Sequence, residues 1–140
     1  MRLSRATGYA LHAFAYLAKQ KDAAPVSTKV IAKATGIPDV FLLKALKPCV
    51  ARQLLDSITG PRGGYRLARQ PEEITVLEVI EAVEGPLVSS SSFRSTKAPS
   101  AVDRAIQHLL NEATACIREV FEGMTIAQLA GLRNHGRSRV

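Results

Sequence analysis

Apolar residues recur every three or four positions through most of the chain, which is the spacing of amphipathic helices. Ser4, Ser27 and Thr75 precede three such stretches, and hydroxyl side chains are favoured caps at helix N-termini. Gly36 and Gly85 follow two of them, and glycine commonly ends helices. The pattern predicts helices over residues 4–19, 27–36, 38–47, 75–85 and 100–123, with a final turn over 125–130.

The second and third helices are joined by residues 34–38, Ala-Thr-Gly-Ile-Pro, which is the spacing of a helix-turn-helix. Pro48 predicts that the third helix kinks or ends near Lys47. Residues 54–59 and 65–68 then have the composition of short strands, and the turn Gly60-Pro61-Arg62-Gly63-Gly64 separates them. A β-hairpin attached to a helix-turn-helix is a wing.

The longest predicted helix carries an apolar stripe that a small domain cannot cover alone, because the helix is roughly 35 Å long at 1.5 Å per residue. The stripe consists of Val102, Ile106, Leu109, Ala113, Ile117 and Val120, with Cys116 as the alternative to Ile117. We expect it to form the seam of a homodimer. The predicted fold is mainly α with a small β-hairpin wing: a winged helix-turn-helix plus a long C-terminal dimerisation helix.

Charge is distributed unevenly along the 140 residues, whose formal net charge is +7. Residues 1–70 contain twelve Lys and Arg against three Asp, whereas residues 71–140 contain seven basic against nine acidic residues. The first half therefore carries the field that attracts a polyanion. Nucleic acid is the leading partner on this evidence, and a solvated basic surface is the alternative.

The candidate DNA-binding residues fall into three groups. The start of the third helix, which enters the major groove in helix-turn-helix proteins, contributes Pro38, Asp39, Val40 and Lys44. The wing contributes Thr59, Arg62 and Arg66, expected at the minor groove or phosphates, and Arg2, Arg5, Lys29 and Lys33 are expected on the DNA backbone.

Other classes of function are disfavoured. The sequence has none of the short motifs typical of metalloproteases, serine hydrolases, dithiol oxidoreductases or P-loop enzymes, so we expect no catalysis. A module that binds another protein through residues 87–100, with little DNA binding alone, remains the alternative function. No apolar run approaches the ~20 residues of a membrane span and no secretory signal is recognisable, which favours the cytoplasm.

Isolated His and Cys residues are weak candidates for sites. His12 is expected to pack among the apolar residues of the first helix, and Cys49 to pack as a small apolar side chain, with redox sensing as its alternative. His108 and Cys116 lie two helical turns apart, too far to share a metal ion within one chain. We therefore expect no protein-held metal site.

Several segments together carry a resemblance to a known family. They are Met1-Arg2-Leu3-Ser4 with residues 7–11, Ile31-Ala32 with Gly36-Ile37-Pro38, the wing from Ser57 to Leu67, residues 74–86, and Thr125-Ile126 with Leu129. Over residues 1–130 the chain resembles the bacterial Rrf-two family of winged-helix transcription regulators, of the IscR, NsrR and CymR type. The resemblance implies a homodimer that binds a two-fold-related operator, often as a repressor. Family members often carry a basic residue where Thr59 stands, which shifts the expected wing contact to Arg62.

The pattern of helices, turns and loops also divides the chain. Residues 1–70 correspond to the DNA-binding region, 71–86 to a connecting helix, 87–100 to a flexible loop, 101–130 to the dimerisation helix and final turn, and 131–140 to a disordered tail. Relatives commonly hold an iron-sulfur cluster on three loop cysteines. The corresponding positions here fall near Ser92, Ala98 and Arg104, and none of these is a thiolate ligand. We therefore expect no cofactor.

Overall fold

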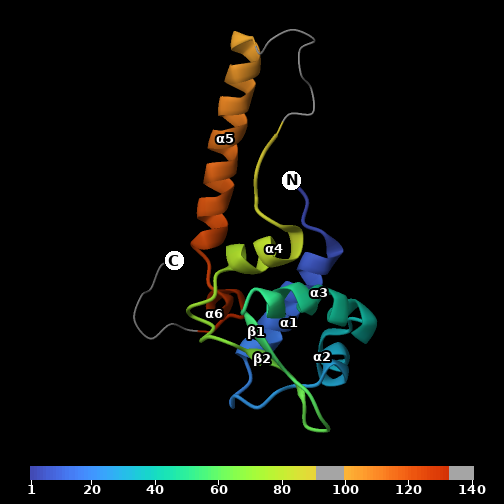
Figure 1. Cartoon of the computed structure of the whole chain (residues 1–140). Coiled ribbons are helices and arrows are strands. Elements are labelled where there is room, and N and C mark those ends of the chain that lie inside the picture. The colour runs from blue at the N-terminus through green and yellow to red at the C-terminus, as the bar shows by residue number, and fades with distance from the viewer. Residues whose placement is uncertain (91–99, 133–140) are drawn as a thin grey trace.

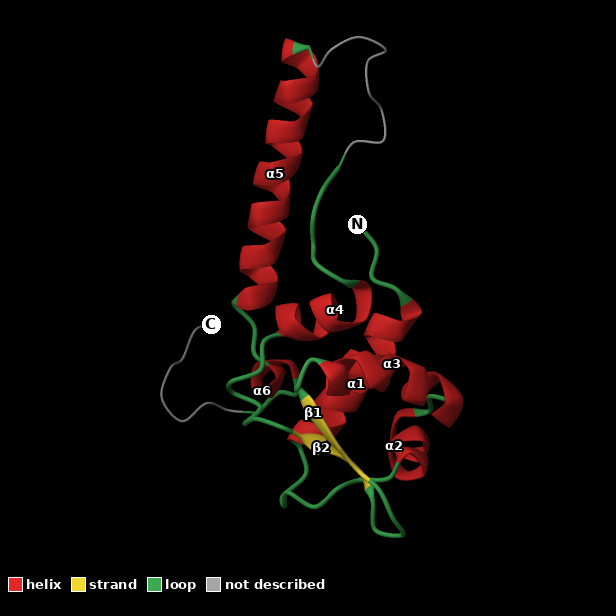
Figure 2. Cartoon of the chain, viewed as in Figure 1, coloured by secondary structure: helices red, strands yellow, loops and turns green. Residues whose placement is uncertain are grey.

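The computed structural model describes residues 1–90 and 100–132. The elements in chain order are α1 (Arg5–Ala18), α2 (Thr28–Thr35), α3 (Asp39–Ala51), β1 (Leu55–Ile58), β2 (Gly64–Leu67), α4 (Val76–Glu84), α5 (Ala101–Glu122) and α6 (Ile126–Leu129). Helices dominate, and β1 and β2 form a two-stranded antiparallel sheet (Figures 1 and 2). The predicted winged helix-turn-helix with a long C-terminal helix is confirmed.

Hydroxyl side chains start the helices as the sequence predicts. The Oγ of Ser4 accepts a hydrogen bond from the N–H of Thr7, and the Oγ of Ser27 accepts one from Val30. Thr75 begins α4 with a reciprocal capping box, in which the Thr75 hydroxyl accepts a hydrogen bond from the N–H of Glu78 and the Glu78 carboxylate accepts one from the N–H of Thr75. These bonds satisfy N–H groups that have no partner inside a helix, and so they fix where each helix begins.

The core is assembled from helices that are far apart in the sequence. Phe14 of α1, Leu46 of α3, Ile80 of α4 and Ile126 of α6 are all fully buried in one cluster. Full burial of a large apolar side chain contributes about 1.5–3 kcal/mol relative to exposure. The helix-turn-helix is therefore stabilised by helices that follow the wing as well as by those that precede it.

The wing is joined to the start of the helix-turn-helix by a short backbone bridge. Val26 and Tyr65 exchange two backbone hydrogen bonds, each 2.8 Å long, on the side of β2 away from β1. Gly64 adopts a φ of +148°, and a Cβ built there would lie 2.1 Å from the carbonyl oxygen of Val26. Only glycine lets the two backbones approach this closely. The double glycine is therefore required by the close packing of the two backbones as well as by the turn.

One expectation is wrong in part and another is wrong. Helix α3 does not end near Lys47 but continues through Pro48 to Ala51, whereas the kink that Pro48 also predicts stays a prediction. Pro48 lies in the last turn, where its missing N–H costs only one backbone bond and the rest of the helix is held by its buried face. His12 is exposed, not packed, because it lies on the face of α1 opposite Ala10, Ala13 and Phe14.

Helix α5 extends away from the rest of the molecule (Figure 1). Its base is fixed by backbone hydrogen bonds between the residues around Thr75 and Thr125, since the N–H of Val76 bonds to Met124 and that of Ile126 bonds to Ile74. Most of the expected flexible loop and of the expected disordered tail, residues 91–99 and 133–140, lies outside the described residues. Within the described ranges, no helix is long and apolar enough to span a membrane.

Candidate DNA-binding surface

Helix α3 is anchored by one face and exposes the other. The buried face consists of Leu42, Ala45, Leu46 and Cys49. Pro38, Val40 and Lys44 are exposed, as a groove-reading helix requires. Asp39 is half-buried, and its Oδ1 accepts a hydrogen bond 2.9 Å long from the N–H of Val40. Its carboxylate is therefore held at the positive end of the helix rather than extended along the exposed face.

Two further side chains share the exposed face of α3. Leu43 and Lys47 are exposed and lie three and seven positions after Val40, so that they join Val40 and Lys44 on one face of the helix. We call Val40, Leu43, Lys44 and Lys47 the α3 strip. The sequence predicts Lys47 to point outward as Lys44 does. Neither Leu43 nor Lys47 is among the DNA-binding residues predicted from the sequence, although their spacing from Val40 is the signal that indicates them.

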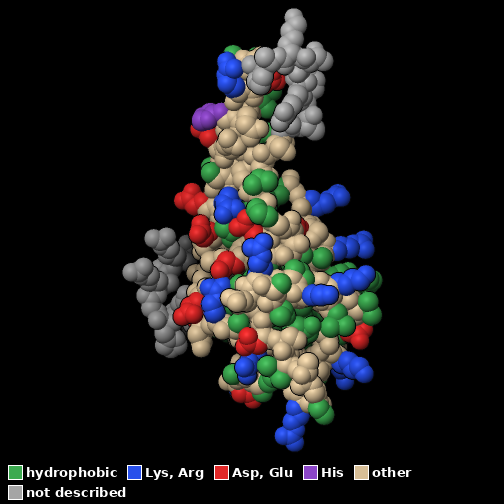
Figure 3. All heavy atoms as spheres, viewed as in Figure 1, with side chains coloured by type: hydrophobic (Ala, Val, Ile, Leu, Met, Phe, Trp, Pro, Cys, Tyr) green, Lys and Arg blue, Asp and Glu red, His purple; other side chains and the backbone are tan. Residues whose placement is uncertain are grey.

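Basic residues surround this face. Lys29 and Lys33 of α2 are exposed, and the first turn of α2 contains no acidic residue to neutralise its positive end. Figure 3 shows Lys and Arg side chains along the edge of the molecule where α2 and α3 lie, whereas most Asp and Glu lie toward α6 and the base of α5. The α2–α3 side thus attracts a polyanion.

The two arginines of the wing differ, because Arg62 is exposed and Arg66 is already paired with a carboxylate. Thr59 and Arg62 are exposed in and beside the turn. Arg66 stands opposite Asp56 in the register of the two strands, and its Nε donates to Oδ2 of Asp56 across 3.1 Å. An arginine bound to a carboxylate offers a phosphate less net charge. Arg62 is therefore the better candidate for a DNA contact.

Two glutamates of α4 connect this helix to the start of α1 and to α5. Oε1 of Glu84 accepts hydrogen bonds from the N–H of Ser4 (2.6 Å) and the buried Thr7 hydroxyl (2.7 Å), which places the exposed Arg2 and Arg5 beside the end of α4. Burial alone would raise the pKa of Glu84, but these hydrogen bonds lower it below its usual value. The carboxylate supplies the negative charge that the first turn of α1 lacks.

The second glutamate holds the long helix. Oε2 of Glu81 accepts a hydrogen bond from Nη1 of Arg118 on α5 at 2.7 Å and another from the N–H of Leu87 at 2.9 Å. Burial raises the pKa of Glu81, but the bonds from Arg118 and Leu87 outweigh it and lower that pKa. Glu81 thus ties α4, α5 and the chain after α4 together.

Helix α5 presents an apolar stripe that nothing in the described chain covers. The exposed members are Val102, Ile106, Leu109, Ala113, Cys116 and Val120, which we call the α5 stripe. Leu109 is 64% exposed and Val120 is 71% exposed. Ile117, which the sequence analysis placed in the seam, is half-buried, and Cys116 lies in the stripe instead.

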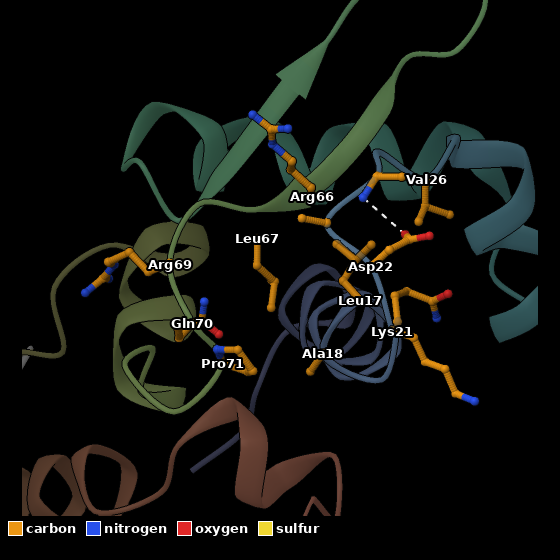
Figure 4. A pocket seen from close by; sticks show the side chains of 13 residues that line it. Leu17, Ala18, Lys21, Asp22, Val26, Arg66, Leu67, Arg69, Gln70 and Pro71 are labelled. Carbon is orange, nitrogen blue, oxygen red and sulfur yellow. Dashed lines mark hydrogen bonds between the residues drawn. The ribbon is translucent and has the colours of Figure 1, made fainter.

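A small cavity of about 260 Å³ lies between the end of α1 and the return strand of the wing. Figure 4 shows Leu67 pointing toward α1, while the guanidinium groups of Arg66 and Arg69 point away from the space. Nη2 of Arg69 is paired with Glu78 at 2.7 Å, as Arg66 is with Asp56. The basic residues near this cavity therefore do not converge on a ligand in it.

The cysteines do not fit an iron-sulfur cluster, which thiolates hold. The sequence contains only Cys49 and Cys116. Cys49 is fully buried, its Sγ donates to the carbonyl of Ala45 at 3.6 Å, and burial raises its pKa to about 12. This confirms its role as a small packing residue. In the described ranges no three His, Cys, Asp or Glu side chains are grouped to hold a metal ion. Arg104 lies on α5, while Ser92 and Ala98 fall outside those ranges.

Comparison with known proteins agrees with this geometry. Residues 3–131 match the Rrf2 family, whose description is iron-dependent transcriptional regulator. A candidate HTH-type regulator of Mycobacterium tuberculosis is 34% identical over 132 residues, covering 94% of this chain and 82% of that protein. The regulator NsrR of Shouchella clausii is 31% identical over 131 residues, covering 92% and 88%.

The fold is similar to a solved structure as well. CymR, the global cysteine regulator of B. subtilis, superposes with a TM-score of 0.78 at 26% identity and covers 96% of this chain and 99% of its own. These proteins are transcriptional regulators and not enzymes, which confirms that expectation. The chain therefore belongs to the Rrf2 family of transcriptional regulators.

Proposed function

We propose that this regulator acts as a homodimeric repressor in the cytoplasm, binding a two-fold-related DNA operator through α3 and the wing. The observation that carries the proposal is the exposed face of α3, which is flanked by the lysines of α2 and by the exposed wing turn. The winged helix-turn-helix family places the corresponding helix in the major groove. The basic first half of the chain supplies the general attraction to phosphates.

The α5 stripe supports the homodimer. A stripe of this length and exposure is typical of a helix that packs against another copy of itself. Two protomers joined along α5 present two α3 helices, which matches the symmetry of a palindromic operator.

The test is a selection of bound duplexes from a random 30-base-pair library by the purified protein, followed by gel-shift titration of the enriched duplex. Enrichment of a two-fold-related sequence supports the proposal. Absence of any shift by the protein alone, with a shift on adding cell extract, would favour a regulator that depends on a protein partner.

Replacing Arg62 with alanine is expected to weaken binding to the selected duplex roughly tenfold, because each dimer loses two cationic contacts. The sequence preference at the outer ends of the site should relax as well, since the wing lies beside the flanking groove. Fluorescence anisotropy titrations against end-substituted duplexes measure both effects.

Arg52→Ala is the charge-matched control, because Arg52 is an exposed arginine at the end of α3, away from the wing turn. It should change the affinity less and leave the preference intact. If the two variants bind the duplex with the same affinity and the same sequence preference, the wing is not part of the DNA-contact surface.

We further propose that DNA binding by this chain does not depend on an iron-sulfur cluster, since its cysteines do not supply the thiolates. Protein purified without oxygen is expected to be colourless. Its affinity for the selected duplex should be the same before and after incubation with iron and sulfide. A brown protein that changes DNA affinity when it loses its visible absorbance would show that other ligands hold a cluster.

A further inference from the structure

The exposed face of α3 is partly apolar. Val40 is 58% exposed and Leu43 is 45% exposed, and Lys44 and Lys47 complete the α3 strip. The opposite face of α3 is buried in the core, so the strip is held rigidly outward. Two adjacent aliphatic side chains beside two lysines offer an apolar contact to a partner that the positive charge attracts.

The neighbouring side chains of α3 make contacts within the protein. The ring of Phe41 stacks on Tyr9 of α1, with centroids 6.0 Å apart and planes inclined by 19°. Asp39 is bonded to the N-terminal turn of α3. The helix sequence, Asp-Val-Phe-Leu-Leu-Lys-Ala-Leu-Lys-Pro-Cys-Val-Ala, contains no Arg, Asn, Gln, Ser or Thr. Helix α3 therefore lacks the arginine and amide side chains that recognise guanine or adenine in bidentate fashion, and among its exposed side chains only Lys44 and Lys47 can donate to guanine.

The major groove offers one apolar group to such a surface, the C5 methyl of thymine. We propose that Val40 and Leu43 read thymine methyl groups, so that each operator half-site carries thymines at two neighbouring steps where α3 enters the groove. The two residues lie about 4.5 Å apart along the helix axis, close to the base-pair rise of about 3.4 Å. Lys44 and Lys47 add cationic contacts on the same side. This inference rests on the proposed DNA-binding function.

The experiment replaces the thymines of the selected duplex with deoxyuridine, one position at a time, which removes the methyl group and keeps the base pair. Affinity should fall roughly three- to tenfold at each thymine read by α3, as expected for one methyl group buried. Substitutions at other thymines should have little effect. Placing 5-methylcytosine at a read position should bind better than unmodified cytosine there.

Two variants test whether the α3 strip causes the loss of affinity when thymine methyl groups are removed. The double variant Val40→Ala, Leu43→Ala should bind thymine and uracil duplexes equally, since the groups that sense the methyl are gone. Leu129→Ala removes an exposed leucine of α6 and should keep the full thymine preference. Thermal unfolding and sedimentation should match the unaltered protein for both, because all three side chains are exposed.

The outcomes separate this inference from the proposed function. Tight binding that is indifferent to every thymine methyl would overturn methyl reading and leave DNA binding standing. A double variant that retains the methyl preference would also overturn it. A change of oligomeric state in the double variant without DNA would show that the strip is a protein contact instead. Failure of the unaltered protein to bind any duplex would defeat the proposed function itself.

Discussion

Replacing Leu109 and Val120 together with glutamate is expected to dissociate the proposed homodimer and to lower DNA affinity at least ~100-fold. Each protomer would place two carboxylates in an apolar seam, where an unpaired charge is costly. Without the dimer, the two α3 helices no longer bind as one unit, and the gain from binding both half-sites together is lost. Sedimentation should give the mass of one 15.1 kDa chain instead of twice that mass.

Ala115→Glu is the matched control. Ala115 is exposed on α5, away from the α5 stripe and on the polar side where His108 and Glu112 face each other at 3.2 Å. The same charge there should leave both the dimer and DNA binding intact. A double variant that remained dimeric and bound DNA normally would show that the stripe is not the seam.

The affinity for the selected duplex is expected to fall about 10³-fold or more between 50 and 200 mM salt. Two protomers that each offer several basic residues are expected to neutralise on the order of 6–10 phosphates, and binding then releases the counterions of those phosphates. Anisotropy titrations at several salt concentrations give the slope. Arg62→Ala should make the slope shallower, whereas a nearly flat dependence for the unaltered protein would remove nucleic acid as the main partner.

The helices were predictable because their boundaries are encoded locally. Ser4, Ser27 and Thr75 cap helices in the structure as the sequence indicates, since a hydroxyl and the N–H three residues later need nothing else to meet. The end of α3 was not predictable from Pro48. Buried Leu46 and Cys49 hold the last turn in place, and this tertiary packing outweighs the local preference of proline.

The candidate site was predictable in outline and less so in detail. The exposure of Arg62 and of the α3 face agrees with the sequence, and these residues remain predicted contacts. The pairing of Arg66 with Asp56 depends on strand register, which a turn sequence alone leaves open. The choice between Cys116 and Ile117 depends on how α5 is rotated against α4, and only the fold fixes that rotation.

The connection between Thr75 and Thr125 has a practical consequence for building hybrid regulators. The end of α5 returns to the body beside the start of α4, because Val76 and Ile126 bond to the chain on either side of that junction. The elements before and after α5 share a continuous core, and cutting at residue 70 would separate Phe14 from Ile80 and Ile126. The corresponding segment of a relative is therefore best grafted between Pro86 and Met124, with Glu81 and Arg118 exchanged as a pair.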